Sequence, residues 1–376
     1  MKMEDVILTE SAQAVRIIHP EDLIFSEEGI GGAERAIKGL AQMVSGSEPT
    51  SIKWDGYPAL VFGRGVDGQL IVCDKYMFGK GDGTGRVTSP AAFRQYDANR
   101  GADRTDLYAK INLLWPALEI MIPAGFRGFY VGDLLYAGRL QPTSGLYVFK
   151  PNTVTYRVAA NSATGQLISH SIAGIAVHTF IPGIGEGDQP LDGLGGLPQG
   201  GPIWFVSGAM PVPRVHMDAR ALMHAQSVLK KYGDAIVSTK AKLGEMRAKN
   251  VVSLVGPYIT SRIDSGNFNH MLEGFYQFLA TRLSPRAAAT MLGTRDGFLY
   301  QEGRAGIEGI LAVWVAIYNL KLNVKQQIDG QLGSSEVQAS IGNIPGHEGY
   351  VVGGGSEKFK LIDRLEFTRA NNAKNN

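Results

Sequence analysis

The sequence predicts an α+β protein in which a mainly helical block lies between two β-rich segments of the chain. Short apolar and β-branched runs, separated by Gly and Pro turns, occupy most of residues 51–181. Apolar residues at helical spacing dominate residues 218–331. Strand-like runs return after residue 345. We therefore expect a β domain built from residues 1–202 and 346–376, with a helical domain of residues 203–345 inserted between its two parts.

The first half of the chain alternates helices with strands. Apolar residues at helical spacing predict a helix over residues 27–45. The runs "ALVFGR" and "QLIVCDK" flank Asp67 and Gly68, and this pattern predicts a β-hairpin. A second helix is expected over 106–121, followed by strands over 126–138 and 169–181 and by a strand pair within 145–159.

The second half begins with a Gly- and Pro-rich stretch, residues 182–202, which indicates a long loop. A short strand over 203–209 leads into the helical block. Near the end, "GYVV" and "KFKLI" flank "GGGS", which is typical of a hairpin. The polar tail, residues 368–376, is expected to be frayed.

The composition is that of a soluble globular protein, with 44% hydrophobic and 19% charged residues in a chain of 376. Because 37 basic side chains are nearly balanced by 35 acidic ones, attraction to a polyanion has to come from local clusters of basic residues. The single cysteine, Cys73, excludes an internal disulfide framework and suits a reducing compartment. The apolar stretch 306–320 is too short for a membrane span, so we expect a cytoplasmic protein with no membrane partner.

Six short motifs follow one another along the β-rich parts of the chain. They are "KWDG" at 53–56, "VCDKYMF" at 72–78, "FYVGDLLY" at 129–136, "GIAVHTF" at 174–180, "EGYVV" at 348–352 and "EKFKLID" at 357–363. Each is weak alone: Lys-x-Asp-Gly fixes only three positions, and Asp-Gly favours an ordinary exposed turn. Their value lies in their number and order.

This ordered series resembles the covalent nucleotidyltransferase superfamily of DNA ligases, RNA ligases and mRNA-capping enzymes. It also looks like a group of phage-encoded ligase-like proteins, so the resemblance implies the cytoplasm of an infected bacterial host. The implied fold is a nucleotidyltransferase (ligase adenylation) domain of antiparallel sheets, with the helical insertion between motifs IIIa and IV. The resemblance covers residues 50–180 and 345–365, and the block at 203–345 has no counterpart.

The resemblance implies a catalytic role for six residues. Lys53 takes the place of the lysine that attacks the α-phosphate of ATP to form a lysyl-AMP intermediate. Asp55 would position the reacting group, and Lys75 resembles the basic residue of the strand after motif I. Glu348 resembles the motif IV acid that binds Mg²⁺ or Mn²⁺, with Asp55 as a second metal ligand. Lys358 and Lys360 match the paired motif V lysines that grip the α-phosphate.

Further residues would bind the nucleotide. Gly56 would let the backbone pass close to it, and Asp133 replaces the usual glutamate that holds the ribose. The motif IIIa strand supplies an aromatic that stacks on adenine, for which His178 and Phe180, on one face of a strand, are the candidates. DNA ligases carry an arginine two residues after the motif I glycine. Proline stands there in this chain, and Arg64 is the nearest arginine.

The chemistry agrees with these roles. A lysine amine is protonated at neutral pH and is then no nucleophile. Neighbouring cations disfavour the protonated form, and they also stabilise charge on a transferring phosphoryl group. Because Lys358 and Lys360 are two positions apart, a strand projects both to one face.

The function expected from the sequence is thus an ATP-dependent polynucleotide ligase of the RNA type. Its substrates would be RNA or DNA ends that carry a 5′-phosphate and a 3′-hydroxyl, held partly by basic residues of the helical block. One alternative is a DNA ligase. Another is a degenerate nucleotidyltransferase that serves as a nucleic-acid-binding or virion-associated protein, and transfer of AMP to a protein is a third.

Overall fold

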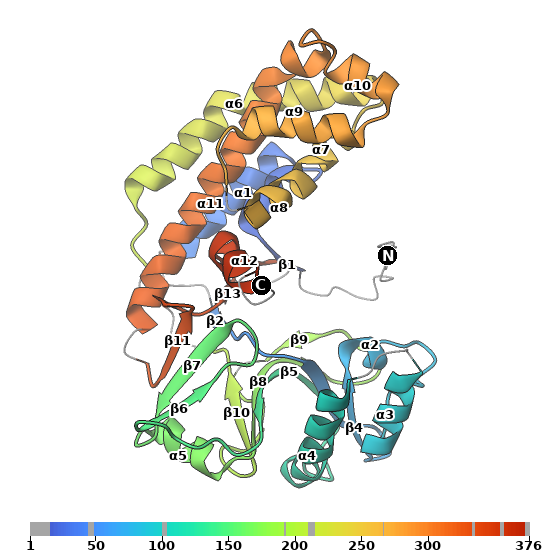
Figure 1. Cartoon of the computed structure of the whole chain (residues 1–376), viewed down its shortest axis with the longest axis vertical. Helices are drawn as coiled ribbons and strands as arrows, with labels where there is room; N and C mark the ends of the chain where they lie inside the picture. Colours follow the sequence, from blue (N-terminus) through green and yellow to red (C-terminus); the bar gives the residue numbers. More distant parts are fainter. Residues whose placement is uncertain are drawn as a thin grey trace. The chain divides into compact units, whose positions relative to one another are not determined.

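The computed structural model describes residues 16–43, 49–99, 104–191, 193–209, 215–265, 267–332, 335–353 and 357–372. It has the mixed α+β architecture that the sequence predicts, with several antiparallel strand pairs and many helices (Figure 1). The described residues divide into two compact units. Unit 1 comprises Met1–Arg16, Ser51–Met210 and Leu332–Glu348, and unit 2 comprises Ile17–Thr50, Pro211–Gln331 and Gly349–Asn376.

These units differ from the expected boundaries at four places. The first helix and the C-terminal segment from Gly349 onward belong to the helical unit, and residues 203–210 and 332–348 belong to the β unit. The first helix joins the helical unit because it packs along the long helix that starts at Ala219. Phe359 of the C-terminal hairpin packs so closely on Gly39 of the first helix that a Cβ there would lie 2.3 Å from its ring.

Unit 1 contains most of the strands. In chain order its elements are β2 (Thr50–Lys53), β3 (Ala59–Arg64), β4 (Leu70–Asp74), α2 (Lys75–Phe78), α3 (Pro90–Ala98), α4 (Thr105–Met121), β5 (Gly128–Ala137), β6 (Leu146–Phe149), β7 (Val154–Ala159), α5 (Ala163–His170), β8 (Ala173–Ile181), β9 (Gln189–Pro190), β10 (Ile203–Ser207), β11 (Val337–Ile341) and β12 (Ile344–Pro345).

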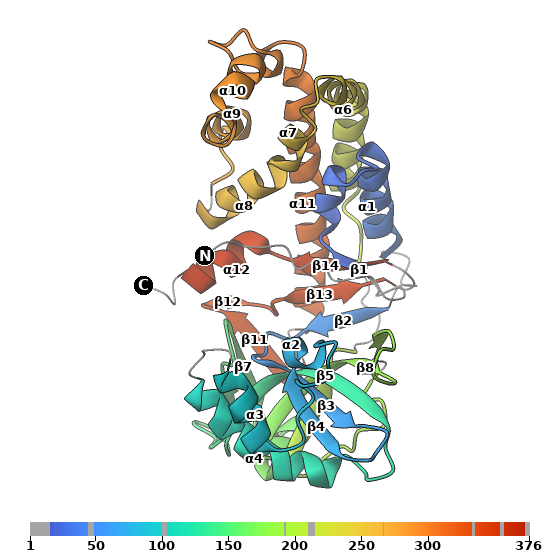
Figure 2. The ribbon, with the colours of Figure 1, turned by 90° about the vertical axis from the view of Figure 1, so that its right-hand side faces the viewer.

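The main sheet of unit 1 has the strand order β10-β8-β5-β3-β4, and β9 pairs with β8 (Figures 1 and 2). Only β10 and β8 run parallel among these described pairs. In the β3–β4 hairpin Leu60 lies opposite Asp74, and in the β3–β5 pair Ala59 lies opposite Asp133. A second sheet has the order β12-β11-β7-β6. The expected hairpin of β3 and β4 and the expected pair of β6 and β7 are confirmed.

The core of unit 1 lies between the main sheet and α4. Leu114 and Leu118 of α4 and Phe62 and Val72 of the sheet are fully buried in one cluster. The apolar pattern of α4 explains its position, because a helix buries the side on which its apolar residues recur. At its C-terminal end, the main-chain oxygens of Glu119 and Ile122 accept hydrogen bonds from the buried Arg64 guanidinium.

Unit 2 is mainly helical. Its elements are β1 (Arg16–Ile18), the 3₁₀-helix η1 (Pro20–Phe25), α1 (Ile30–Gln42), α6 (Ala219–Glu245), α7 (Asn250–Ser253), α8 (Val255–Ser265), α9 (Met271–Arg282), α10 (Pro285–Met291), the 3₁₀-helix η3 (Phe298–Tyr300), α11 (Arg304–Leu332), β13 (Gly349–Val352), β14 (Glu357–Ile362) and α12 (Arg364–Asn372). The expected C-terminal hairpin is confirmed as the antiparallel pair of β13 and β14.

The long helices α6 and α11 pack side by side (Figure 1). Gly306 and Gly309 of α11 face Thr239 and Tyr232 of α6, and a Cβ on either glycine would lie within 2.6 Å of those side chains. By length and composition α11 is the one described helix that could cross a membrane. Since 67% of its most apolar window is buried, it also has the features of the core helix of a soluble protein.

Two expectations about local structure are wrong. The polar tail is not frayed as far as Asn372, because α12 forms there with the Asp363 carboxylate accepting a hydrogen bond from the Glu366 amide. Residues 373–376 lie outside the described part. Lys75 is not on a strand. Asp74 caps the short helix α2 by accepting a hydrogen bond from Met77, so Lys75 is the first residue of that helix.

Candidate functional site

The residue expected to react, Lys53, ends strand β2 in unit 1. The Ile52 amide donates a hydrogen bond to the Gly208 carbonyl at 2.6 Å, which ties β2 to the chain after β10. The next side chain, Trp54, is buried and donates through Nε1 to the Ser207 carbonyl. Between these two fixed neighbours the Lys53 side chain keeps 33% of its surface exposed. It is therefore held in place at its backbone and is accessible at its amine.

Lys53 and Glu348 meet although 295 positions separate them. Lys53 Nζ donates a hydrogen bond to Glu348 Oε2 at 2.5 Å. Glu348 is only 7% exposed, and this burial raises the pKa of its carboxyl to about 7, against the opposing effect of the Lys53 ammonium. A carboxylate with a pKa near neutrality, in contact with an amine, can accept that amine's proton.

Asp55 has a different role from the one expected. Its Oδ2 accepts hydrogen bonds from the Thr153 and Val154 amides at 2.5 and 2.7 Å, and its Oδ1 accepts from the Asn152 side chain at 2.7 Å. Its own amide donates to the Tyr156 hydroxyl. The buried Asp55 therefore fixes the turn before β7 against the residue that follows Lys53. These contacts support a positioning role and give no support to the expected metal ligation by Asp55.

Gly56 is required by a close approach of two chain segments. A Cβ at this position would lie 2.5 Å from the Asp133 Cβ and 3.0 Å from the Leu134 carbonyl oxygen. The Tyr57 amide then donates to that same carbonyl at 2.9 Å. The absence of a side chain at Gly56 thus brings Asp133 of β5 next to the "KWDG" segment. The close neighbour of this glycine is the protein itself, whereas the expected neighbour was a nucleotide.

Asp133 lies in a group of charges. Burial raises the pKa of its carboxyl to about 6, while the positive charges of Lys53 and Lys75 act to lower it. His178 Nε2 lies 3.8 Å from Asp133 Oδ2. Desolvation, together with the charges of Lys75 and Lys53, lowers the pKa of His178 to about 4, so this imidazole is neutral at neutral pH. Two cations, one neutral imidazole and two carboxyls with raised pKa values therefore share one region of unit 1.

Phe180 and Arg64 are not part of this group. A bulge in the β5–β8 pair aligns Thr179 with Val131 but Val177 with Gly132, which leaves His178 without an opposite residue. Phe180 therefore lies on the other face of the sheet from Asp133 and packs against Tyr130. The expected common face of His178 and Phe180 is wrong.

The Arg64 guanidinium donates hydrogen bonds to main-chain carbonyls at the end of α4 and to the Glu119 carboxylate. Its role in the structure is to stabilise a helix terminus, and this contradicts the expected nucleotide contact.

Lys358 and Lys360 belong to unit 2, where both lie on β14. Lys360 is opposite Val351 of β13, and the two-residue spacing places the lysines on one side of the hairpin as expected. Burial lowers the pKa of Lys358. The convergence of these lysines with Lys53 on one phosphate stays a prediction.

The residues fit a Mg²⁺ ion only as part of a complex with phosphates. Among the described residues, no three His, Cys, Asp or Glu side chains form a metal-binding group. Mg²⁺ usually takes one or two carboxylates together with waters and substrate phosphates, and Glu348 can supply one such carboxylate.

Sequence reasoning missed the residues that hold the lysine segment. Tyr156 is fully buried, accepts the Asp55 amide, and lies with its ring centroid 5.0 Å from that of Trp54. His347, next to Glu348, packs edge-on against Trp54. The signal available was the alternation of "VTYRV", which places Tyr156 on the inner face of β7.

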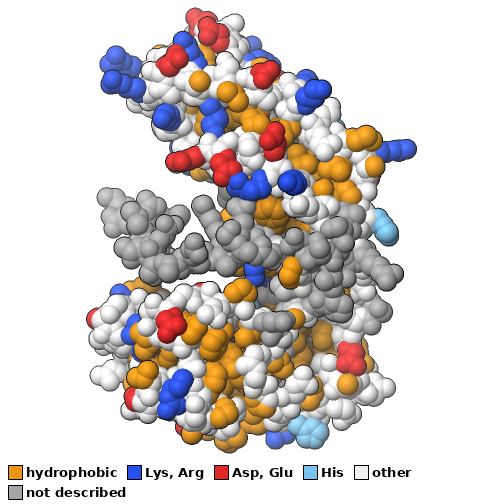
Figure 3. All heavy atoms as spheres, turned by 180° about the vertical axis from the view of Figure 1, so that it is seen from behind, with side chains coloured by type: hydrophobic (Ala, Val, Ile, Leu, Met, Phe, Trp, Pro, Cys, Tyr) orange, Lys and Arg blue, Asp and Glu red, His pale blue; other side chains and the backbone are white. Residues whose placement is uncertain are grey.

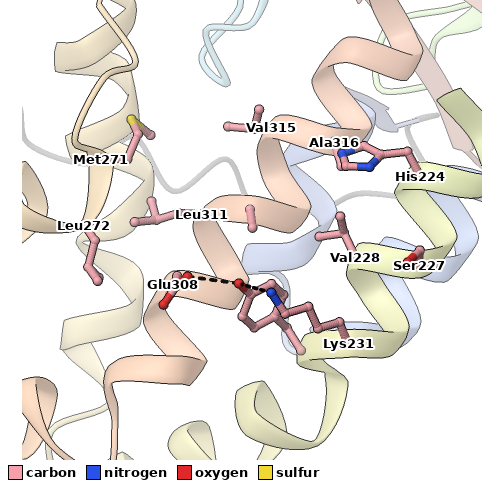
Figure 4. A pocket seen from close by; sticks show the side chains of 12 residues that line it. His224, Ser227, Val228, Lys231, Met271, Leu272, Glu308, Leu311, Val315 and Ala316 are labelled. Carbon is pink, nitrogen blue, oxygen red and sulfur yellow. Dashed lines mark hydrogen bonds between the residues drawn. The ribbon is translucent and has the colours of Figure 1, made fainter.

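A separate hollow of about 530 Å³ lies within unit 2 between α6, α9 and α11 (Figure 4). Its wall is mostly apolar, with Val228, Leu311 and Val315 among the lining residues. At its rim Lys231 donates to the Tyr232 hydroxyl, which donates to Glu308. None of the residues expected to form the site lines this hollow.

The chain belongs to the DUF6267 family, whose description is a family of unknown function and whose model matches residues 16–376. The comparison with curated proteins gives no match, and the comparison with solved structures gives none either.

Proposed function

We propose that this protein is an ATP-dependent nucleotidyltransferase that carries AMP on Lys53, and that it acts as a polynucleotide ligase of the RNA type. The observation that carries the proposal is the contact between Lys53 and Glu348. The amine of Lys53, whose side chain is 33% exposed, lies 2.5 Å from a buried carboxyl whose pKa is about 7. This pairing supports a nucleophile with its own proton acceptor.

The proposed reaction uses each residue in a defined way. Glu348 accepts a proton from Lys53, and the freed nitrogen attacks the α-phosphorus of ATP. A nitrogen–phosphorus bond forms, the bond from this phosphorus to the bridging oxygen breaks, and pyrophosphate leaves with the second proton of the attacking nitrogen. Bound Mg²⁺ would neutralise charge on the phosphates. Lys75 adds positive charge beside the site, and Lys358 and Lys360 are expected to bind the same phosphates.

The joining steps follow from the adduct. AMP would pass from Lys53 to the 5′-phosphate of a polynucleotide, and a 3′-hydroxyl would then displace it. A nucleotidyltransferase fold is part of this proposal, and the antiparallel sheets of unit 1 are compatible with it.

The direct test is incubation of the protein with radiolabelled ATP and Mg²⁺, followed by denaturing electrophoresis. We expect a labelled protein band that Lys53→Ala and Lys53→Arg both abolish, because arginine keeps the charge but is not a nucleophile. Lys110→Ala is the matched control, since Lys110 is a solvent-accessible lysine of unit 1 that pairs with Asp106 on α4. A wild-type protein that forms no adduct with any nucleoside triphosphate contradicts the proposal.

A second set of assays separates the ligase classes. Nicked DNA, nicked RNA and single-stranded RNA would be offered to the adenylylated protein. Joining of RNA ends alone supports the RNA type, and joining of nicked DNA alone favours the DNA-ligase alternative.

A further inference from the structure

Two exposed aromatic rings distinguish the surface next to Lys53 from the rest of the molecule. Tyr57 is 63% exposed and Tyr76 is 53% exposed. Among the described residues, they are the only Phe, Trp or Tyr side chains that are exposed. Tyrosine rings are usually at least partly covered, because burying an aromatic ring is strongly favourable. These two exposed rings therefore offer surface on which a planar group can stack.

The fold brings these rings to the same end of the main sheet. In the β3–β4 hairpin Leu60 lies opposite Asp74. Tyr57 precedes Leu60 by three residues and Tyr76 follows Asp74 by two, so both segments leave the sheet at the same end. Asp133, opposite Ala59, lies at this end as well. Both tyrosine segments thus leave the sheet at the end where Asp133, a member of the charged group, lies.

Positive charge accompanies the rings. Lys75 is exposed and directly precedes Tyr76, and Lys80 places its ammonium 4.6 Å from the centre of the Tyr76 ring. Arg86 follows in the same loop. The one nearby acid of that loop, Asp82, is engaged by the amide and hydroxyl of Thr84. Aromatic rings beside several cations form the combination by which proteins bind single-stranded nucleic acids without reading their sequence.

The charges of unit 2 do not form an equally simple binding surface for a nucleic acid. On the face drawn in Figure 3, basic and acidic side chains of its helices are interspersed. On α6, for example, Lys242 pairs with Glu245, which reduces the attraction of that lysine for phosphates.

We infer that Tyr57 and Tyr76 form a stacking platform for unpaired bases at the end of a single-stranded polynucleotide, with Lys75 and Lys80 contacting its phosphates. The inference deepens the proposed function and rests on it for the identity of the reaction, because it specifies a single-stranded end as the substrate. Binding itself requires no chemistry at Lys53.

The test measures binding of a short fluorescein-labelled single-stranded RNA with a 5′-phosphate, by fluorescence anisotropy with the full-length protein. We expect Tyr57→Ala and Tyr76→Ala each to weaken binding roughly five- to 100-fold, since one stacked base is lost in each. Tyr57→Phe and Tyr76→Phe are expected to bind within about twofold of the wild type, because phenylalanine keeps the stacking face. Since both rings are exposed, neither alanine variant opens the core.

Ile120→Ala is the matched control. Ile120 is 76% exposed and lies on α4 next to Glu119, which pairs with Arg64 at the far end of β3. Its removal is expected to leave RNA binding unchanged. Alanine variants of the tyrosines that bind RNA as well as the wild type overturn the inference.

The adduct assay separates this inference from the proposed function. A higher KM for ATP in the alanine variants, with unchanged RNA binding, means that the rings stack on the adenine of ATP and overturns the inference. Tyrosine-dependent RNA binding by a protein that forms no adduct supports the platform and contradicts the proposed reaction.

Discussion

Two lysine–glutamate pairs of this protein have the same chemistry and the same separation but opposite surroundings. Lys53 in unit 1 donates to Glu348, and Lys321 in unit 2 donates to Glu21, each at 2.5 Å. Both partners of the second pair are completely buried, whereas Lys53 is 33% exposed. Pairing with a glutamate therefore does not by itself distinguish the lysine proposed to react from a structural one. Access to the amine distinguishes them.

The neighbours of each pair agree with this distinction. Arg364 contacts both Glu21 and Asp22, and the Lys321 ammonium lies 4.5 Å from the centre of the Tyr318 ring. The Lys321–Glu21 pair at the centre of this network is fully buried, and Arg364, the first residue of α12, connects the network to the C-terminal helix. Around Lys53, by contrast, Asp133, His178 and Lys75 are groups that can bind or exchange protons and phosphates.

The largest predicted effect on stability concerns the buried pair. Lys321→Met leaves the Glu21 carboxyl without its closest partner, and we expect a loss of about 3–5 kcal/mol in the free energy of unfolding. Lys53→Ala is expected to cost less than about 1 kcal/mol, because its amine is accessible to water. Urea unfolding followed by circular dichroism measures both. The double variant Glu21→Leu/Lys321→Met should recover much of the loss. Equal losses in the free energy of unfolding for the two lysine variants would contradict the distinction between the buried and the accessible pair.

The next effect concerns Glu348 in its proposed role as proton acceptor. Glu348→Gln is expected to slow adduct formation by about a hundredfold or more, since a positioned base contributes on this scale. In the wild type the rate should rise with pH through about 7, because the carboxylate accepts a proton only after losing its own. Rates of labelled adduct formation, measured from about pH 5.5 to about pH 8.5 so that they span the expected pKa, test both points. A glutamine variant that keeps the wild-type pH profile would exclude Glu348 as the acceptor.

The same carboxyl has a consequence for stability that needs no activity assay. Its ordinary pKa is 4.5, and burial raises the pKa of Glu348 to about 7 in the folded protein. Between these values the folded protein keeps a proton that the unfolded chain has lost, so the contribution of Glu348 to the free energy of unfolding falls as pH rises. Urea midpoints of the wild type relative to Glu348→Gln should therefore decrease over this window. A difference between the two proteins that is constant with pH would contradict the raised pKa.

The smallest effect concerns Arg64, a buried cation like Lys321. Arg64→Met leaves the Glu119 and Ile122 carbonyls without this donor, and we expect a loss of about 2 kcal/mol in the free energy of unfolding. The adduct formed per folded molecule should stay at the wild-type level. Loss of the adduct at unchanged stability would support the nucleotide contact that the sequence suggested for Arg64.

Most elements of the fold could be predicted because they follow local patterns. The β3–β4 hairpin shows this, since Asp67 and Gly68 mark its turn, and α1 shows it through its apolar spacing. The polar sequence of α12 carries no comparable pattern. Its capping by Asp363, which also accepts a hydrogen bond from Tyr318, depends on contacts formed only in the folded unit.

The candidate site was predictable where a motif fixes the residue and unpredictable where the surroundings decide its role. The sequence indicated Lys53 and Glu348, and the structure brings them together. It could not indicate the bulge at His178, because one extra residue in a strand leaves no signature in hydrophobicity but reverses the face of Phe180. The sequence also could not indicate that the Asp55 carboxylate accepts hydrogen bonds from backbone amides about a hundred positions away.

The central claim is that Lys53 carries the nucleotide, and mass spectrometry of the digested protein after incubation with ATP and Mg²⁺ tests it most directly. The account predicts a peptide that contains Lys53 and is heavier by one adenylyl group, with the acid lability of a phosphoramidate. Lys321 and Lys110 should stay unmodified in the same digest. An adenylyl group on another residue, with Lys53 unchanged, would contradict the account.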